Sequence, residues 1–222
     1  MLLLVFIFLL LFLLEPTSPP QNVFISNITE HQATVSYTTK KPTTAGLLIS
    51  KDGTFPLFSI LATFIKDDGE KNTDKLGFYT THHITISNLD PKTAYTFQIY
   101  QGLRSMYKGK FLTAETLSSV ASPTPVYGKA FTAEKKPLVG AIVYLQVANG
   151  SNKSSLLSTL TNIEGGWSID LANLRTEDGT NSFPLSPQSI ETVVVEAGAL
   201  GSGKASVSPG QDKPWPDILI SK

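Results

Sequence analysis

The chain of 222 residues contains no cysteine. This absence excludes structural disulfides, thiolate catalysis, cysteine-based zinc sites, iron–sulfur clusters and a lipidated cysteine. There are only three histidines, so any imidazole chemistry depends on His31, His82 or His83. Because 41% of the residues are hydrophobic and only 16% are charged, the sequence predicts folded domains rather than disorder.

Neither half of the chain has a clustered surplus of positive charge. Residues before position 118 include 10 basic and 9 acidic side chains, and the rest include 8 basic and 9 acidic ones. A protein that binds nucleic acid non-specifically needs clustered positive charge to neutralise phosphates. We therefore expect no nucleic-acid partner.

The N-terminus begins with thirteen consecutive apolar residues after the first methionine. As a helix this run would rise about 20 Å, which is short of the roughly 30 Å of a membrane hydrocarbon core. It resembles the apolar region of a signal peptide, without the usual preceding Lys or Arg and without a small-residue cleavage site. The run can be a cleaved signal, a membrane anchor or a helix that packs with copies of itself. It consists of Leu2, Leu3, Leu4, Val5, Phe6, Ile7, Phe8, Leu9, Leu10, Leu11, Phe12, Leu13 and Leu14.

A proline-rich stretch follows at residues 15–21 and predicts a stiff, extended spacer. From there to residue 117 the sequence alternates between apolar and polar residues, and turn residues interrupt it every eight to twelve positions. This pattern is typical of an all-β sandwich. The predicted strands cover residues 22–26, 33–38, 45–50, 58–64, 82–87, 94–101 and 110–113.

One short motif in this region indicates a specific corner. Leu89 is followed by Pro91 and then by Tyr95. These residues resemble the tyrosine corner of a fibronectin type III domain. Together with the seven predicted strands, they make residues 22–117 as a whole resemble such a domain. The resemblance implies that Tyr95 pins the fold through its hydroxyl. The sequence departs from that family at Tyr37, where a core Trp is usual, and in a long insertion at residues 51–79.

Residues 118–125 are rich in Ser, Pro, Thr and Ala and predict a linker. Residues 126–222 then contain a strand, a turn ending in Gly140, a second strand, a Thr-rich strand, and Gly165-Gly166-Trp167 opening a fourth. This succession is similar to the carboxypeptidase-regulatory-like and collagen-adhesin B-type families of transthyretin-like sandwiches. We expect Gly140 to adopt a left-handed conformation, Gly165 and Gly166 to close a tight turn, and Trp167 to be buried.

No catalytic or metal motif emerges from the candidate residues. His82 and His83 are adjacent on a predicted strand, so they point to opposite faces and cannot chelate one ion. We expect the acidic segments 67–70 and 177–178 to be solvated turns rather than calcium loops. No Gly-x-Ser-x-Gly motif is present for a Ser-His-Asp mechanism, and we expect residues 201–204 to form a flexible turn. Sequons for N-glycosylation begin at Asn27, Asn149 and Asn152.

These observations predict an all-β fold, with two immunoglobulin-like or transthyretin-like sandwiches in series after an N-terminal hydrophobic helix. The predicted function is a non-enzymatic, exported surface protein with a structural or adhesive role, without catalytic, cofactor or metal residues. It would be extracellular and held at the cell surface through its N-terminal helix, which contacts a membrane or copies of itself. One alternative is a self-assembling filament or pilus subunit. Another is a carbohydrate-binding module that uses an aromatic row in the insertion, from Phe55, Phe58, Phe64, Phe78 and Tyr79.

Overall fold

The structure is a computed structural model that describes residues 17–55, 63–71, 76–119 and 121–222. The apolar segment from Leu2 to Leu14 lies outside these described residues. Within them, no helix has the length and apolar character needed to cross a membrane. The described chain consists of strands and three short 3₁₀ helices, which confirms the predicted all-β fold.

The first sandwich consists of a three-stranded sheet, in the order β1-β2-β5, facing a four-stranded sheet, in the order β4-β3-β6-β7. All the neighbouring strands are antiparallel. This arrangement is the fibronectin type III-like sandwich that the sequence predicts. The strands are β1 (Gln21–Ser26), β2 (Ala33–Thr43), β3 (Gly46–Ser50), β4 (Ile65–Lys66), β5 (Tyr79–Ile86), β6 (Ala94–Gln101) and β7 (Arg104–Leu112), with the 3₁₀ helix η2 (Asp68–Glu70) before β5.

The core of the first sandwich comes from the inward positions of alternating strands. Val35 and Tyr37 on β2 face Ile84 on β5, while Phe97 and Ile99 on β6 enter from the other sheet. Successive strand residues point to opposite faces, so the polar residues between these apolar ones point outward. On β2 and β5 these outward polar residues are also buried, because the second sandwich covers them.

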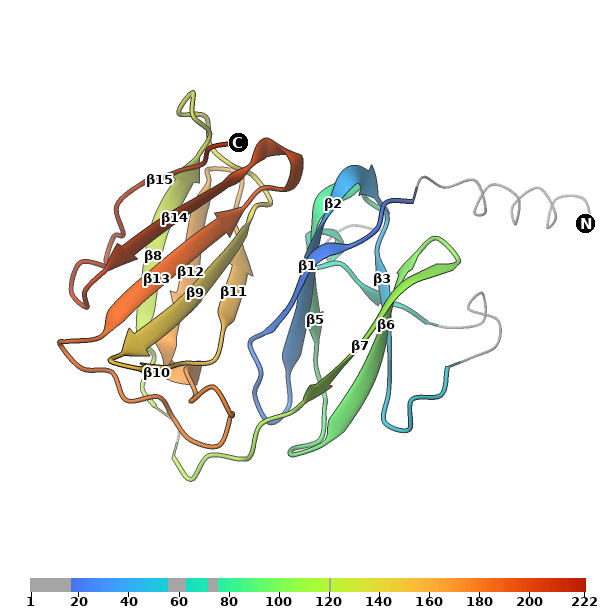
Figure 1. Ribbon diagram of the computed structural model, residues 1–222, viewed down its shortest axis with the longest axis horizontal. Coiled ribbons are helices and arrows are strands. Elements are labelled where there is room, and N and C mark those ends of the chain that lie inside the picture. Colours follow the sequence, from blue (N-terminus) through green and yellow to red (C-terminus); the bar gives the residue numbers. More distant parts are fainter. Residues whose placement is uncertain (1–16, 56–62, 72–75, 120) are drawn as a thin grey trace, which may run out of the picture.

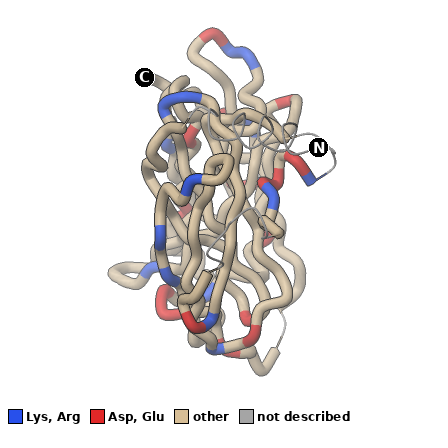
Figure 2. Tube along the Cα trace, turned by 90° about the vertical axis from the view of Figure 1, so that its right-hand side faces the viewer, with Lys and Arg blue, Asp and Glu red and all other residues tan. Residues whose placement is uncertain are grey.

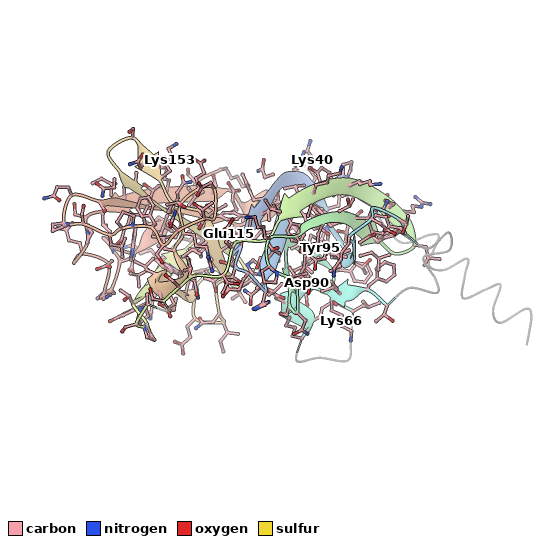
Figure 3. All side chains as sticks on the ribbon, turned by 90° about the horizontal axis from the view of Figure 1, so that it is seen from below. Lys40, Lys66, Asp90, Tyr95, Glu115 and Lys153 are labelled. Atoms are coloured by element: carbon pink, nitrogen blue, oxygen red, sulfur yellow. The ribbon has the colours of Figure 1, made fainter. Side chains whose placement is uncertain are left out.

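The corner before β6 has the geometry that its motif implies. The Tyr95 hydroxyl accepts a hydrogen bond of 3.0 Å from the backbone N–H of Asp90, and Figure 3 shows the two residues side by side. The Tyr95 ring stacks on Phe111, with 5.5 Å between centroids. Leu89 is buried in the same core. Tyr95 thus joins the loop between β5 and β6 to the interior of the sandwich.

Several predicted strand boundaries differ from the structure. Most of the predicted strand at 58–64, including Phe58, lies outside the described residues, and the short β4 follows it. Strand β7 begins at Arg104 rather than at residue 110, because Gly102 adopts a positive φ of 56° and closes a tight hairpin with β6. The predicted flexible turn at residues 201–204 is wrong, since Ser202 begins β14.

The second sandwich also has two sheets. In one, β9 pairs with β13 on one side and with β10 and β11 on the other, and β14 extends the sheet beyond β13. The other sheet has the order β12-β8-β15. The elements are β8 (Pro125–Phe131), β9 (Ile142–Asn149), β10 (Asn152–Lys153), β11 (Leu157–Leu160), β12 (Gly166–Asp170), β13 (Ile190–Glu196), β14 (Ser202–Val207) and β15 (Ile218–Leu219), with the 3₁₀ helices η3 (Leu171–Asn173) and η4 (Gly198–Leu200).

Two tryptophans and a set of valines fill the second core. Trp167 on β12 and Trp215 before β15 meet edge to face, with 5.9 Å between ring centroids. Val193 and Val195 on β13 approach them from the opposite sheet. Full burial of such side chains is worth about 1.5–3 kcal/mol each, so this cluster supplies much of the stability of the sandwich.

The two sandwiches lie side by side rather than end to end (Figure 1). The sheet containing β1 and β5 faces the sheet containing β9 and β11, and the chain crosses between the bodies at one end only. Basic and acidic positions are interspersed along the chain trace in Figure 2. The molecule therefore has a stack of four sheets in which the two central ones meet at the junction between the sandwiches.

The glycines singled out in the second sandwich have different surroundings. Gly140 and Gly165 have positive φ angles of 68° and 74°, whereas Gly166 lies within β12. A Cβ added to Gly165 would lie 2.5 Å from the carbonyl oxygen of Ala130. A Cβ on Gly140 would meet nothing within 4 Å. Gly165 is therefore restricted by space and by backbone angle, and Gly140 by backbone angle alone.

We expect Gly140→Ala to lower the free energy of unfolding by about 1–2 kcal/mol, the cost of a left-handed backbone for a residue with a Cβ. Gly165→Ala should cost about 3 kcal/mol or more, because the methyl group also collides with backbone that cannot move aside. Urea denaturation followed by tryptophan fluorescence measures both values. Equal losses for the two variants would contradict this explanation.

Candidate functional site

Polar side chains that could take part in binding or catalysis gather at the junction between the sandwiches. Ser36 on β2 and the hydroxyl of Tyr144 on β9 are 2.8 Å apart. Thr81 on β5 donates a hydrogen bond of 2.7 Å to the carbonyl oxygen of Gly140. Phe24 on β1 meets the Tyr144 ring edge to face at 5.1 Å. Burial raises the pKa of Tyr144, so its hydroxyl stays neutral at the junction.

Asn27 makes the most complete contact across this junction. Its Oδ1 accepts a hydrogen bond from the backbone N–H of Ser158, and its Nδ2 donates to the Ser158 carbonyl, both at 2.9 Å. The Asn27 backbone N–H also donates to the carbonyl of Leu156. The amide of Asn27 thus pairs with β11 as a neighbouring strand would. It is held in place by a third bond, from Nδ2 to the Thr34 hydroxyl in its own sandwich.

This pairing changes the interpretation of the first sequon. The Nδ2 atom of Asn27, to which a glycan would be attached, is committed to three acceptors at the junction. A glycan there would require the sandwiches to separate. Asn149 and Asn152, which begin the other two sequons, lie instead at the β9–β10 hairpin, where Asn152 is exposed.

His83, Asp68 and Ser158 form a chain that resembles a Ser-His-Asp triad. Nδ1 of His83 lies 2.6 Å from Oδ2 of Asp68, and Nε2 lies 2.8 Å from Oγ of Ser158. Because an ionised carboxylate only accepts hydrogen bonds, Nδ1 of His83 carries a hydrogen and donates a hydrogen bond to Asp68. Sequence reasoning missed this group, since its members lie on η2, β5 and β11 and no local motif joins them.

The bonding of Ser158 makes this chain structural. Its Oγ lies 2.6 Å from Ser26 Oγ and accepts a bond of 3.2 Å from Nδ2 of Asn27, in addition to its contact with His83. A hydroxyl has one proton and two lone pairs, so these three partners use all of its capacity. An acyl group on Ser158 would have to displace them, because the residue is only 7% exposed. The triad geometry therefore joins the two sandwiches.

Two of the three acidic residues in segment 67–70 are buried, which corrects the prediction of a solvated turn. Asp67 and Glu70 are almost completely covered. Oδ2 of Asp67 lies 3.1 Å from Nδ1 of His82, and His82 stacks on the fully buried Tyr37 with 4.5 Å between centroids. His82 and His83 point to opposite faces of β5. His82 pairs with Asp67, the N-cap of η2, and His83 pairs with Asp68 within η2. Two adjacent histidines thus fix the insertion to β5.

Electrostatics at this segment agree with the geometry. Burial opposes ionisation of Asp68, but hydrogen bonds from His83, Lys71 and Thr85 outweigh it and lower the pKa of its carboxyl to about 2. Burial raises the pKa of Glu70, and the nearby Asp67 adds to this effect. Asp68 is therefore a permanent anion that holds the His83 ring in position beside Ser158.

Arg175 joins the sandwiches at a second place. This side chain belongs to the loop before β13 and is 3% exposed. Its Nη1 donates a hydrogen bond of 2.8 Å to the carbonyl of Glu115, and its Nη2 forms an ion pair with Glu30. Both partners belong to the first sandwich. The junction is thus bonded at Ser158, Tyr144 and Arg175.

No group of three or more metal-ligating side chains exists among the residues that the structure describes. At the second acidic segment, Oδ1 of Asp178 accepts bonds from Thr176 and from the backbone and side chain of Thr180. These bonds lower the pKa of Asp178. Its carboxylate therefore stabilises its own loop.

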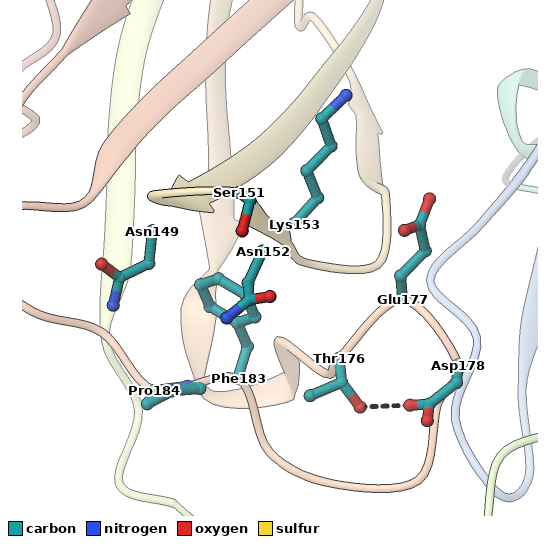
Figure 4. Close-up of a pocket in the computed structure, with 9 residues that line it drawn as sticks. All are labelled: Asn149, Ser151, Asn152, Lys153, Thr176, Glu177, Asp178, Phe183 and Pro184. Atoms are coloured by element: carbon teal, nitrogen blue, oxygen red, sulfur yellow. Dashed lines mark hydrogen bonds between the residues drawn. The ribbon is translucent and has the colours of Figure 1, made fainter.

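A pocket of about 580 Å³ opens beside this loop (Figure 4). Phe183 lies at its base, with Asn149 and Asn152 on one side and Thr176 and Glu177 on the other. Two of the three sequons border it. The pocket is wide, polar side chains line it together with Phe183 and Pro184, and these residues form no convergent pair of catalytic groups.

A second groove, of about 640 Å³, crosses the outer face of the β12–β8 sheet. Tyr127 on β8 lies in this groove and is 45% exposed. The only two tryptophans of the chain, Trp167 and Trp215, also border it. The Pro-Trp-Pro segment at residues 214–216 thus contributes Trp215 to the core and borders a surface groove.

The aromatic residues predicted for glycan binding in the insertion do not form a row in the described part of the chain. Phe64 packs on Tyr100, Tyr79 packs on His82, and Phe55 lies under Lys108. Phe78 is exposed, and Phe58 lies outside the described residues. These side chains point in separate directions, whereas the aromatic groove belongs to the second sandwich.

Comparison with known proteins identifies no family. No protein-family model and no curated protein match the sequence. Among solved structures, PhoD is similar over 53% of this chain and 23% of its own, with 12% identity and a TM-score of 0.32. The FN1–FN3 domains of chicken CNTN1 are similar over 93% of this chain and 67% of theirs, with 13% identity and a TM-score of 0.31. At these values the likenesses carry no argument about function, and the fold rests on the strand pairing.

We expect Asn27→Ala to lower the free energy of unfolding by about 2–4 kcal/mol, since it removes several buried hydrogen bonds and leaves the Ser158 N–H unpaired. Asn27 has a positive φ of 51°, so Asn88→Ala, at a φ of 59° on an exposed turn, is the matched control for backbone cost. Scanning calorimetry should resolve two transitions in the Asn27 variant and one in the parent. Identical traces for both variants would contradict the junction described above.

A pH dependence is expected from Glu191, which is buried on β13 without a hydrogen-bond partner for Oε2. Burial and the nearby Asp212 raise its pKa to about 7, although Lys213 partly opposes them. The Glu191 carboxyl therefore binds its proton more tightly in the folded protein than in the unfolded chain. Its contribution to stability is complete below about pH 4.5 and is lost as the pH rises through 7.

Glu191→Gln should accordingly remove this loss and stabilise the protein at pH 8 by about 1–3 kcal/mol relative to the parent. At pH 4.5 the two proteins should be equally stable. Urea denaturation at pH 4.5, 6 and 8 measures the difference, with the exposed Glu177→Gln as control. A parent whose stability is constant over this range would refute the assignment.

Proposed function

We propose that this chain is a non-enzymatic, exported cell-surface protein with a structural or adhesive role, held at the surface by its N-terminal apolar segment. The junction is the observation that supports this proposal most directly. The residues best suited to acid, base or nucleophilic chemistry, His83, Asp68 and Ser158, serve to join the sandwiches. The resulting body is rigid, which suits a protein that bears load or presents a binding surface.

The second sandwich is proposed to be of the carboxypeptidase-regulatory-like type. Support comes from the order of its elements, in which Gly140 exits a turn before β9 and Gly165 precedes Trp167 on β12. Such sandwiches act through loops and sheet faces, as binding surfaces on rigid scaffolds commonly do. The grooves of this sandwich are on its loops and outer sheet.

The N-terminal segment is proposed to need a partner outside the described body. The two cores are filled by side chains of the strands and their loops. Ser18 is fixed to the first sandwich, because its N–H donates to Gln101 Oε1 and its carbonyl accepts from Gln101 Nε2. Thirteen apolar residues before this anchor would be costly in water. A membrane would cover them, or copies of the same segment would do so in the alternative filament.

The test compares the full chain with a shortened chain that begins at Thr17 and so keeps the contacts of Ser18. If the proposal holds, the full chain partitions into detergent or membranes as single particles, and the shortened chain is soluble and monomeric. Regular fibres formed by the full chain alone, seen by negative-stain electron microscopy, would favour the filament alternative. A full chain that stays monomeric in water without detergent would refute both.

A further inference from the structure

The groove across β12 and β8 combines an apolar surface with polar side chains that have no partner. Tyr127 presents its ring on the outer face of β8, next to Pro214 and the rim of Trp215. On the opposite, inner face of β8, Gly128 lets the two tryptophans pack closely against the strand, because a Cβ there would come within 2.8 Å of Trp215 and 2.9 Å of Trp167. The exposed Tyr127 ring thus lies on a strand whose inner face is packed against the core.

The turn before β12 holds one wall of the groove in position. Oδ1 of Asn162 accepts bonds of 2.9 Å from the backbone N–H groups of Glu164 and Gly166. The Asn162 carbonyl accepts a further bond of 3.0 Å from the N–H of Gly165. These bonds fix the backbone of the turn and the position of the Asn162 side chain beside the groove.

Donors and acceptors at the rim are unoccupied. Nδ2 of Asn162, the carboxylates of Glu164 and Asp217 and the ammonium of Lys129 have no hydrogen bond or ion pair to any residue that the structure describes. The groove thus offers both hydrogen-bond donors and acceptors beside an aromatic ring. Two carboxylates against one ammonium leave it slightly negative, so a phosphate or another anion is disfavoured.

A sugar ring matches this combination. A pyranose has an apolar face of C–H groups, which an aromatic ring covers, and a rim of hydroxyls that each donate and accept hydrogen bonds. With a volume of about 640 Å³, the groove has room for a sugar ring. A peptide ligand would instead draw most of its affinity from main-chain bonds to a sheet edge. One edge of this sheet is β12, whereas Tyr127 lies on the central strand β8.

We propose that this groove binds a neutral pyranose unit of a glycan chain, with Tyr127 against the sugar ring and Asn162, Glu164 and Asp217 on its hydroxyls. This inference rests on the proposed adhesive role and supplies its ligand class. It also moves the predicted carbohydrate site from the insertion of the first sandwich to the second sandwich.

The two tryptophans make the proposal directly measurable. Both border the groove, so a ligand bound there is expected to change the tryptophan emission of the folded protein. The probes are neutral oligosaccharides of glucose, mannose, galactose and N-acetylglucosamine, titrated into the full chain in detergent. We expect a saturable change in emission with at least one probe. Tyr127→Ala should weaken that binding at least about tenfold, which corresponds to about 1.4 kcal/mol.

Tyr107→Ala is the matched control, because Tyr107 is 39% exposed on β7 of the first sandwich, away from the groove. It should leave the binding unchanged. The proposal is overturned if no probe gives saturable binding, or if Tyr127→Ala and Tyr107→Ala bind equally well. It is also overturned if sedimentation shows that a second copy covers the groove. In these cases the surface-anchoring proposal still stands, because the detergent partitioning of the full and shortened chains tests it separately.

Discussion

The pairing of the Asn27 amide with the backbone of Ser158 is the interaction on which the rest of the architecture depends. The side-chain amide of Asn27, in the first sandwich, makes the two hydrogen bonds to β11 that a neighbouring strand would make. Once this register is set, Ser158 meets His83 and Ser26, and Tyr144 meets Ser36. These contacts need the same relative position of the two bodies. One amide therefore selects a single arrangement from the many that a linker allows.

The junction is polar, and this has physical consequences. Buried hydrogen-bonding groups contribute little net stability when paired, but each costs about 1–3 kcal/mol when it is left without a partner. A small displacement of one sandwich would break several bonds together and expose none of them fully to water. The interface is thus more a determinant of geometry than a source of stability. Rigid geometry is what a structural or adhesive protein needs.

Periodicity predicted most of the strands, because each sandwich buries one face of every sheet and leaves a clear alternation. Tyr95, Gly165 and Trp167 were recognisable for the same reason, since a corner, a turn and a large indole are local requirements. The structural role of Asp67 and Asp68 was not recognisable, because a solvated acidic turn and a buried one have the same sequence pattern. Only their approach to His82 and His83, fifteen residues away, distinguishes the two.

The sequence by itself determined the all-β class, the two sandwiches and the absence of cysteine chemistry, since composition, alternation and turn residues act over a few positions. Tertiary structure alone decided that the sandwiches lie side by side and that His83 and Asp68 meet Ser158. It also decided that the exposed aromatic groove belongs to β8 and β12. These features join residues as far apart as Asn27 and Ser158, separated by 131 positions. Such contacts depend on how the folded sheets pack against each other, and no local sequence pattern predicts this packing.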